Sequence, residues 1–252
     1  MNIGYNNLFC WFDLHTPDKN LSRFFYETVF GWSFEDHNVG EDNAYTGLMH
    51  SDKAFGGVEP LPLDQAAQWI GYVGVEDFQE RFAALQALGA QVILEGIVVP
   101  DLGTIGILRD PFGAMVALLQ PADRENLSWL PRRGNPGDLD WAELSTDNVP
   151  AALEFYGAAF GWTFSDDAPE SLGDYRFILR DGALVGGVRK RPAEVPHSGW
   201  YFYGNVDDVS ASLTKATGLS AKLLIEREVP DMVHFALVTD PQGATIGIAR
   251  GA

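Results

Sequence analysis

The 252-residue sequence contains a single cysteine, few basic side chains and no long apolar run. Cys10 alone cannot form an intramolecular disulfide, a cysteine zinc site or a dithiol redox pair. No stretch approaches the roughly 20 apolar residues of a membrane helix, and the N-terminal segment lacks the pattern of a signal peptide. We therefore expect a soluble, cytoplasmic protein that keeps its thiol reduced and has no membrane partner.

Basic residues are outnumbered by acidic ones, 17 against 35, which gives a formal charge of -18. A surface with this excess of negative charge repels DNA and RNA, so we expect no nucleic-acid partner. The sequence also lacks a phosphate-binding loop, a dinucleotide fingerprint, a nucleophile elbow and an HExxH helix. Composition and motifs thus point away from the common nucleotide-dependent and protease classes.

What the sequence does contain is an internal repeat with an offset of 130 residues, which carries Trp11 onto Trp141. Residues 9–35 align with residues 139–165, and both segments contain the letters FY followed by FGW. We interpret residues 1–121 as a first domain and residues 139–252 as a second. The prolines, glycines and polar residues of 122–138 indicate a linker, in which Trp129 and Leu130 are expected to pack against the rest of the protein.

Each copy shows the pattern of a strand, a helix and three strands, twice over. In the first module a strand is expected from Phe9 to His15, and Asp18 then caps a helix that ends at Gly31. Leu21, Phe24, Phe25 and Thr28 recur at helical spacing and are expected to form its apolar face. Further strands are expected near 32–35, 44–50, 54–59, 69–75, 91–99, 104–109 and 115–119, and further helices near 77–88, 149–160 and 209–217.

Three motifs carry a family resemblance: W-x-[DE]-L-x-T at Trp11–Thr16, F-Y-x-x-x-F-G-W at Phe25–Trp32, and D-P-x-G at Asp110–Gly113, all of which recur in the second copy. Together they resemble the vicinal-oxygen-chelate superfamily, which includes glyoxalases, bleomycin-resistance proteins and dioxygenases, and in particular tandem bacterial glyoxalase-like proteins. The resemblance implies an α+β fold of four βαβββ modules in two tandem domains, with curved mixed sheets, helices on the outside and concave cavities. The modules could pair within a copy or between copies.

Metal-dependent members of that superfamily hold a divalent ion with His, Glu or Gln from four strands. The resemblance places these positions at Trp11 and Trp141, Gly57 and Gly187, Ile70 and Tyr201, and Ala117 and Gly247. These residues do not form a metal-binding tetrad. Glu59 lies close to one position, but its repeat counterpart is Arg189, of the opposite charge. We therefore expect no cofactor, with a divalent metal as the alternative.

Alternation along the first strand of each copy places an indole and a carboxylate on one face: Trp11 with Asp13, and Trp141 with Glu143. A carboxylate against an indole in a cleft with little water would suit acid-base chemistry or ligand binding. The alternative is a tryptophan that belongs to the core and a carboxylate that is paired structurally. We take Asp13 and Glu143 as catalytic candidates and the two tryptophans as ligand-binding candidates.

The same alternation adds His15 in the first copy and Ser145 in the second, so the copies differ at the third inward position. His15 is a further catalytic candidate, although it is also typical of an exposed strand end. The remaining ligand-binding candidates are Tyr45 and Tyr175, at matched positions, Tyr201 and His234.

The resulting hypothesis is a small-molecule-binding protein of the glyoxalase/bleomycin-resistance fold without a catalytic metal, acting by binding, sequestration or modest acid-base chemistry in a cavity. The alternative is a glyoxalase-type lyase or isomerase, or an extradiol-type dioxygenase, with an unconventional metal site. Whether the protein is an enzyme stays open. A monomer that contains the equivalent of a dimer, or a homodimer, would be compatible with the duplication.

Overall fold

The computed structural model describes residues 5–38, 44–123, 134–166 and 168–251, apart from the side chains of residues 37, 38, 44 and 45. The predicted packing of Trp129 and Leu130 lies outside these residues. The first copy forms β1 (Phe9–Thr16), α1 (Lys19–Phe30), β2 (Ser33–Asn38), β3 (Ala44–His50), β4 (Lys53–Pro60), β5 (Gln68–Gly74), α2 (Phe78–Ala87), β6 (Gln91–Val99), β7 (Gly103–Arg109) and β8 (Met115–Pro121).

The second copy repeats this order in β9 (Leu139–Thr146), α3 (Val149–Phe160), β10 (Thr163–Phe164), a 3-10 turn at Glu170–Leu172, β11 (Tyr175–Arg180), β12 (Ala183–Lys190), β13 (Gly199–Asn205), α4 (Val209–Gly218), β14 (Lys222–Val229), β15 (Val233–Thr239) and β16 (Thr245–Gly251). The four βαβββ modules and the α+β class are confirmed. The strand orders are β2-β3-β4-β1-β5-β8-β7-β6 and β10-β11-β12-β9-β13-β16-β15-β14. Both sheets are mixed. In the first, β1 runs parallel to β4 while β3 and β4 are antiparallel, and in the second, β9 runs parallel to β12 while β11 and β12 are antiparallel.

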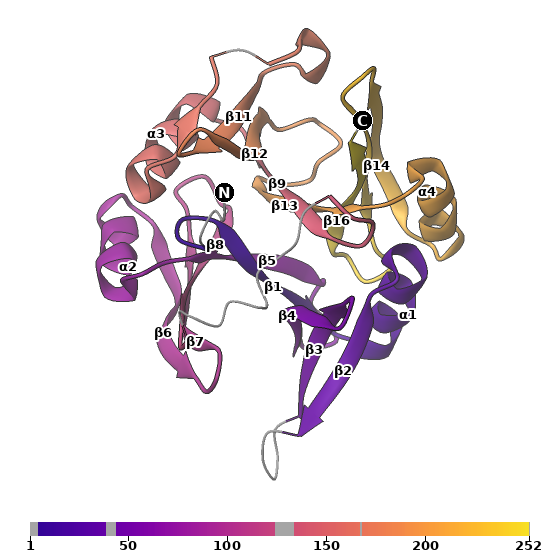
Figure 1. The fold of residues 1–252 in the computed structure, drawn as a ribbon, viewed down its shortest axis with the longest axis horizontal. Helices are drawn as coiled ribbons and strands as arrows, with labels where there is room; N and C mark the ends of the chain where they lie inside the picture. Colours follow the sequence, from indigo (N-terminus) through magenta and orange to yellow (C-terminus); the bar gives the residue numbers. More distant parts are fainter. Residues whose placement is uncertain (1–4, 39–43, 124–133, 167, 252) are drawn as a thin grey trace. The chain divides into compact units, whose positions relative to one another are not determined.

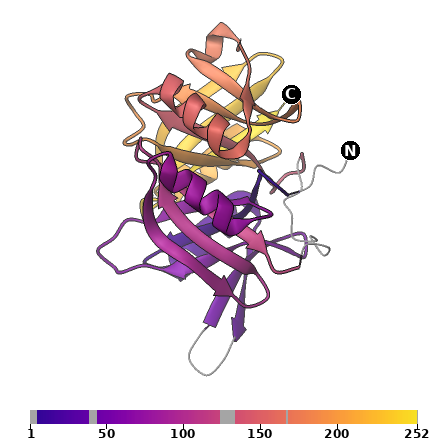
Figure 2. The ribbon, with the colours of Figure 1, turned by 90° about the vertical axis from the view of Figure 1, so that its left-hand side faces the viewer.

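Compact units of the chain combine modules from different copies. The first unit contains the module that ends with β8 and the module that runs from β9 to β12, whereas the second contains β1–β4 and β13–β16. Within the second unit, α1 lies beside α4 (Figure 1). Within the first unit, α2 (magenta) lies beside α3 (salmon) in Figure 2. No helix in the described part of the chain has the length and apolar character needed to cross a bilayer.

Local sequence explains where the helices begin and end. Asp18 accepts hydrogen bonds from the backbone N–H groups of Asn20 and Leu21, which satisfies donors that a helix start otherwise leaves unpaired. Gly31 ends α1 in the left-handed conformation with φ of 72°, where a residue without a side chain is favoured. Asn148 and Gly161 perform the same roles at α3.

The apolar face of α1 differs from the predicted one. Its buried residues are Ser22, Phe25, Tyr26, Val29 and Phe30, while Leu21 and Phe24 are exposed by 57% and 61%. The predicted stripe and the buried one share only Phe25, because both satisfy helical spacing and the sequence favours neither. The polar atoms Tyr26 Oη and Ser22 Oγ face inward because both find hydrogen-bond partners there.

The F-Y and D-P-x-G motifs meet inside each unit. In the second unit Tyr26 Oη donates to Asp240 at 2.9 Å and accepts from Trp69 Nε1 at 2.9 Å. The other oxygen of Asp240 accepts from the backbone of Gln242 and Ala244, which holds the turn. The first unit repeats this network with Tyr156, Asp110 and Trp200, at 2.8 Å for both side-chain bonds. The repeated motifs therefore join one module to another.

Candidate functional site

In the first unit, strands β9, β12 and β11 bring the candidate residues of the second copy to one face of the sheet. Glu143 is level with Gly187, and Ser145 with Arg189, in the parallel pairing of β9 and β12. Arg189 is in turn level with Tyr175 in the antiparallel pairing of β12 and β11. Residues that are level in neighbouring strands point to the same face. The register therefore makes Glu143, Ser145, Tyr175 and Arg189 neighbours.

Tyr175 connects the tryptophan and the carboxylate that alternation predicted on one face. Trp141 Nε1 donates to Tyr175 Oη at 3.1 Å, and the tyrosine hydroxyl is hydrogen-bonded to the Glu143 carboxylate. Burial, followed by the negative charge of Glu143, raises the pKa of Tyr175 well above its usual value, so the phenol stays protonated. The phenol lies over Gly187, where a Cβ would be 1.9 Å from Tyr175 Oη. Glycine at position 187 is thus required by the tyrosine that covers it.

Arg189 supplies the positive charge that Glu143 needs in this buried place. Arg189 Nη1 lies 3.6 Å from Glu143 Oε1, and the two side chains are only 7% and 6% exposed. Removing two charges from water is costly unless each compensates the other, so the pair must be treated as one unit. Arg189 Nε and Ser145 Oγ are buried without a hydrogen-bond partner among the described residues. The cluster therefore retains unused hydrogen-bonding capacity.

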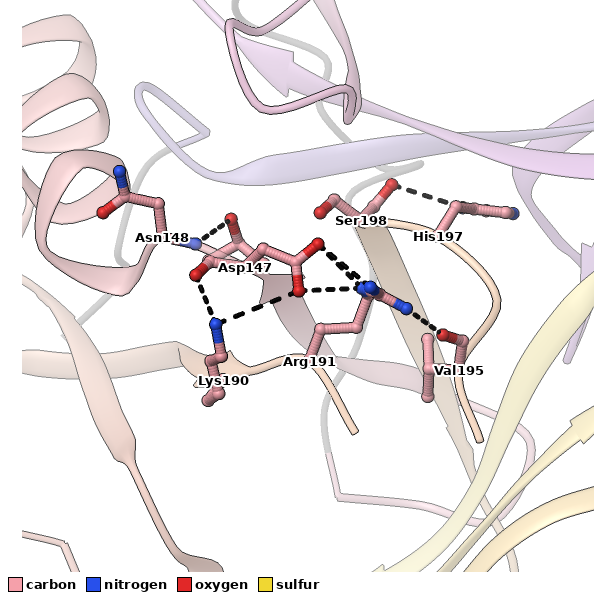
Figure 3. Close-up of polar contacts among 8 residues, drawn as sticks. Asp147, Asn148, Lys190, Arg191, Val195, His197 and Ser198 are labelled. Atoms are coloured by element: carbon pink, nitrogen blue, oxygen red, sulfur yellow. Dashed lines mark hydrogen bonds and ion pairs between the residues drawn. The ribbon is translucent and has the colours of Figure 1, made fainter. Parts of the chain in front are cut away.

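The end of this strand pair is held by a polar clamp, which Figure 3 shows. Arg191 Nε and Nη2 bind the Asp147 carboxylate at 3.0–3.1 Å, and Arg191 Nη1 donates to the carbonyl of Val195 at 2.7 Å. The arginine holds the pKa of Asp147 below its usual value. The first copy has Pro17 and Leu61 at the corresponding positions. This clamp is thus specific to the second copy, next to the row of Ser145 and Arg189.

In the second unit, the equivalent face of the first copy carries acidic residues and an imidazole. Asp13 is level with Gly57, and His15 with Glu59, in the pairing of β1 and β4. Burial lowers the pKa of His15 and raises the pKa of Glu59, because it disfavours the charged form of each. His15 Nε2 is buried and has no hydrogen-bond partner within the described part of the chain. It is the repeat equivalent of Ser145, so both copies carry an unsatisfied polar atom at the same place.

The other sequence-predicted candidates differ in their burial and their partners. Asp13, Trp11 and Tyr201 are buried, at 6%, 5% and 3% exposure. His234 lies on β15, partly exposed, with Nε2 3.1 Å from Glu226. The side chain of Tyr45 lies outside the described residues.

The residues at the positions that the family resemblance assigns to metal ligands offer no suitable set of donor atoms for a divalent ion. Gly187 is covered by the phenol of Tyr175, and a Cβ at Gly247 would lie 1.9 Å from the ring of Tyr203. Ala117 is fully buried and carries no donor atom. Across the described residues, no group of three His, Cys, Asp or Glu side chains is arranged to hold a metal ion. We therefore derive no chemical step through a metal.

Two residues of the cluster were not recognised as site residues from the sequence. In the sequence, Arg189 stands out only as the oppositely charged counterpart of Glu59, and nothing singles out Phe177, whose ring centroid lies 6.2 Å from that of Trp141. The strand register is the information that identifies Arg189 as a site residue. Once Glu143 is level with Gly187, Arg189 falls beside Ser145 two residues later, on the same face.

Comparison with known proteins agrees with this fold. The model of the Glyoxalase/Bleomycin resistance protein/Dioxygenase superfamily matches residues 138–248. The protein named "Putative glyoxylase CFP32" from Mycobacterium bovis is 31% identical over 248 residues, which cover 96% of this chain and 94% of CFP32. Anthracycline biosynthesis protein DnrV from Streptomyces peucetius is 25% identical over 255 residues, with 95% and 92% covered.

Among solved structures, the Mn(II)-bound glyoxalase from Novosphingobium aromaticivorans superposes with a TM-score of 0.64 at 16% identity, covering 97% of this chain and 82% of that one. This structural likeness concerns the fold alone. The similarity to CFP32 spans almost the full length of both proteins. The chain therefore belongs to the glyoxalase/bleomycin resistance protein/dioxygenase superfamily.

Proposed function

We propose that this protein binds a small, partly aromatic organic molecule at the face formed by β9, β11 and β12, without a catalytic divalent ion. The observation that carries the proposal is the buried pair of Glu143 and Arg189, together with Tyr175, behind the partly exposed ring of Trp141. A buried ion pair contributes little net stability, because the cost of desolvation offsets its attraction. A binding role accounts for buried charged and polar side chains that converge on one face of a sheet beside partly exposed aromatic surface.

The aromatic character of the ligand is supported by the rings at the edge of the cluster. Trp141 and Phe177 are half-buried, with their planes at 82°, and Phe177 also meets the ring of Tyr175 edge-on, which gives an aromatic cluster that a further ring can extend. The relative DnrV is named for anthracycline biosynthesis. Small aromatic compounds are therefore the class to screen first.

Acid-base chemistry is a second part of the proposal, with Glu143 acting on its own face in the first unit and Asp13 and His15 acting on theirs in the second unit. Burial keeps His15 mainly neutral near pH 7, so its imidazole is able to accept a proton from a bound molecule. The raised pKa of Glu59, on the neighbouring strand, favours a carboxyl group that can carry a proton. A lyase of the glyoxalase type that uses these groups is the alternative function, and the name of CFP32 favours it.

The first experiment measures metal content and ligand binding on the same preparation. Protein purified without chelator is analysed for metals and then titrated calorimetrically with Ni²⁺, Zn²⁺, Mn²⁺ and Fe²⁺. We expect less than stoichiometric metal and no heat of binding. A stoichiometric metal would contradict the proposal and favour the lyase or a dioxygenase.

Ligand binding is tested by ¹⁵N NMR with a library of small aromatic compounds. We expect amide shifts in β9, β11 and β12, and weaker binding of the same compounds by Glu143→Gln. Glu154→Gln, on the exposed side of α3, is the matched control and should bind as the wild type does. Turnover of a bound compound that is lost in His15→Gln would support the lyase instead of a purely binding role.

A further inference from the structure

Arg189 Nε and Ser145 Oγ are hydrogen-bond donors without a partner among the described residues, and they indicate which class of ligand the site binds. This inference rests on the proposed function. We infer that the site recognises a neutral oxygen acceptor, a carbonyl or phenol oxygen attached to an aromatic ring, through Arg189 Nε and Ser145 Oγ. The ring would lie against Trp141 and Phe177.

The geometry of the two anchors is fixed by strand register. Ser145 and Arg189 are level in the pairing of β9 with β12, so their side chains project side by side from one face. The two residues are 1% and 6% exposed, and neither Ser145 Oγ nor Arg189 Nε has a partner among the described residues. Most buried polar atoms in proteins are hydrogen-bonded. Two buried donors without a partner, on level residues of neighbouring strands, indicate that a ligand supplies the oxygen that accepts their hydrogen bonds.

The charges of Arg189 and Glu143 determine whether the site favours a neutral or a negatively charged ligand. Arg189 already faces Glu143 through Nη1 at 3.6 Å, so the positive charge in the cluster is compensated. A carboxylate ligand would add a second negative charge to a desolvated place, which is unfavourable without a further cation. A carbonyl oxygen satisfies the guanidinium N–H and the serine O–H without adding charge. The cluster therefore favours ketones and phenols over aromatic acids.

Only the second copy has these features. At the positions of Ser145, Arg189 and Phe177 the first copy has His15, Glu59 and Gly47. Glu59 offers no cation, and Gly47 offers no ring. The two faces have therefore diverged in what they can recognise, although they share one fold.

The test compares three probes of similar size: acetophenone with a neutral carbonyl, benzoate with a negative charge, and toluene with no acceptor. Dissociation constants are measured by ¹⁵N NMR titration of the full chain. We expect acetophenone to bind about tenfold more tightly than toluene, the gain of one or two buried hydrogen bonds, and more tightly than benzoate. Arg189→Lys keeps the charge beside Glu143 but removes Nε, and Ser145→Ala removes the hydroxyl.

Each variant should weaken acetophenone binding roughly threefold to tenfold and leave toluene binding nearly unchanged. Arg180→Lys, which keeps the charge of a partly buried arginine paired with the exposed Asp181 in the same unit, is the matched control and should behave as the wild type does. Equal affinity for acetophenone and toluene, or tighter binding of benzoate, would overturn the inference while leaving small-molecule binding intact. If none of the three probes shifts any amide of β9, β11 or β12, the proposed binding function itself fails for this class.

Discussion

Tyr26 donates a hydrogen bond to Asp240 across 214 residues of sequence. The tyrosine belongs to the F-Y motif of the first copy, and the aspartate belongs to the D-P-x-G turn of the second. Tyr156 and Asp110 form the reciprocal bond in the other unit. Two of the three motifs that carry the family resemblance thus serve to join modules, and their contribution can be measured separately from ligand binding.

Replacing Tyr26 by phenylalanine should lower the free energy of unfolding by about 1–3 kcal/mol, because Trp69 Nε1 and Asp240 then lose a buried partner. Tyr156→Phe should have an effect of similar size. Chemical denaturation followed by tryptophan fluorescence measures both. Phe24→Ala, on the exposed side of α1, should change the value by less than about 0.5 kcal/mol. An unchanged stability in Tyr26→Phe would show that the network does not hold the modules together.

Stability should depend on pH through Asp240, whose pKa is raised above the usual value by burial. The folded state then binds the proton more tightly than the unfolded state, so the stability that this group contributes falls as pH rises from the ordinary carboxyl pKa through the folded one. In Asp240→Asn the side chain does not titrate, so the variant does not lose stability in this way as pH rises. The cost of this substitution should therefore be larger near pH 4 than near pH 7. A cost that grows with pH would mean that the hydrogen bonds to the carboxylate outweigh its burial.

Arg189→Met should destabilise the protein by about 3–5 kcal/mol, because it leaves the buried carboxylate of Glu143 without a compensating charge. The double variant Glu143→Gln with Arg189→Met should recover most of that loss. A double-mutant cycle by urea denaturation isolates the coupling between the two side chains. Strictly additive effects would show that the two charges do not depend on each other.

His15 should titrate below the usual histidine pKa of about 6.5, because its imidazole is largely buried. Proton NMR of the ring as a function of pH, assigned with His15→Gln, measures the value. Since the unfolded chain binds this proton more readily, the contribution of His15 to stability should fall as pH drops through the ordinary histidine range. Titration at or above the ordinary value would mean that a negative neighbour outweighs burial.

Much of the fold could be predicted because its signals are local. Asp18 and Gly31 mark the ends of α1, and the alternation in Phe9–Thr16 marks β1. Which face of α1 is buried could not be predicted, since Leu21 and Phe24 are as apolar as the buried Phe25. The burial of Tyr26 depends on Asp240 and Trp69, which the sequence does not place beside it.

The candidate site shows the same division between local and distant information. Alternation placed Trp141 and Glu143 on one face, and both prove to bond to Tyr175. The partner charge could not be found in this way, because Arg189 becomes a neighbour of Glu143 only through the register of β9 with β12. Sequence alone therefore suggested the acid and the aromatic rings but not the cation that completes them.

Because each unit combines modules from both copies, the two units become complete at different times during synthesis. The first unit consists mainly of the middle two modules, which leave the ribosome one after the other. The second unit needs β1–β4 and β13–β16, the first and the last of the four described modules. The β1–β4 module must therefore wait until β13–β16 has been synthesised before it finds its partner, and closing so long a loop slows folding. Translation thus sets an order in which the unit with Glu143 and Arg189 can assemble first and the unit with Asp13 and His15 last.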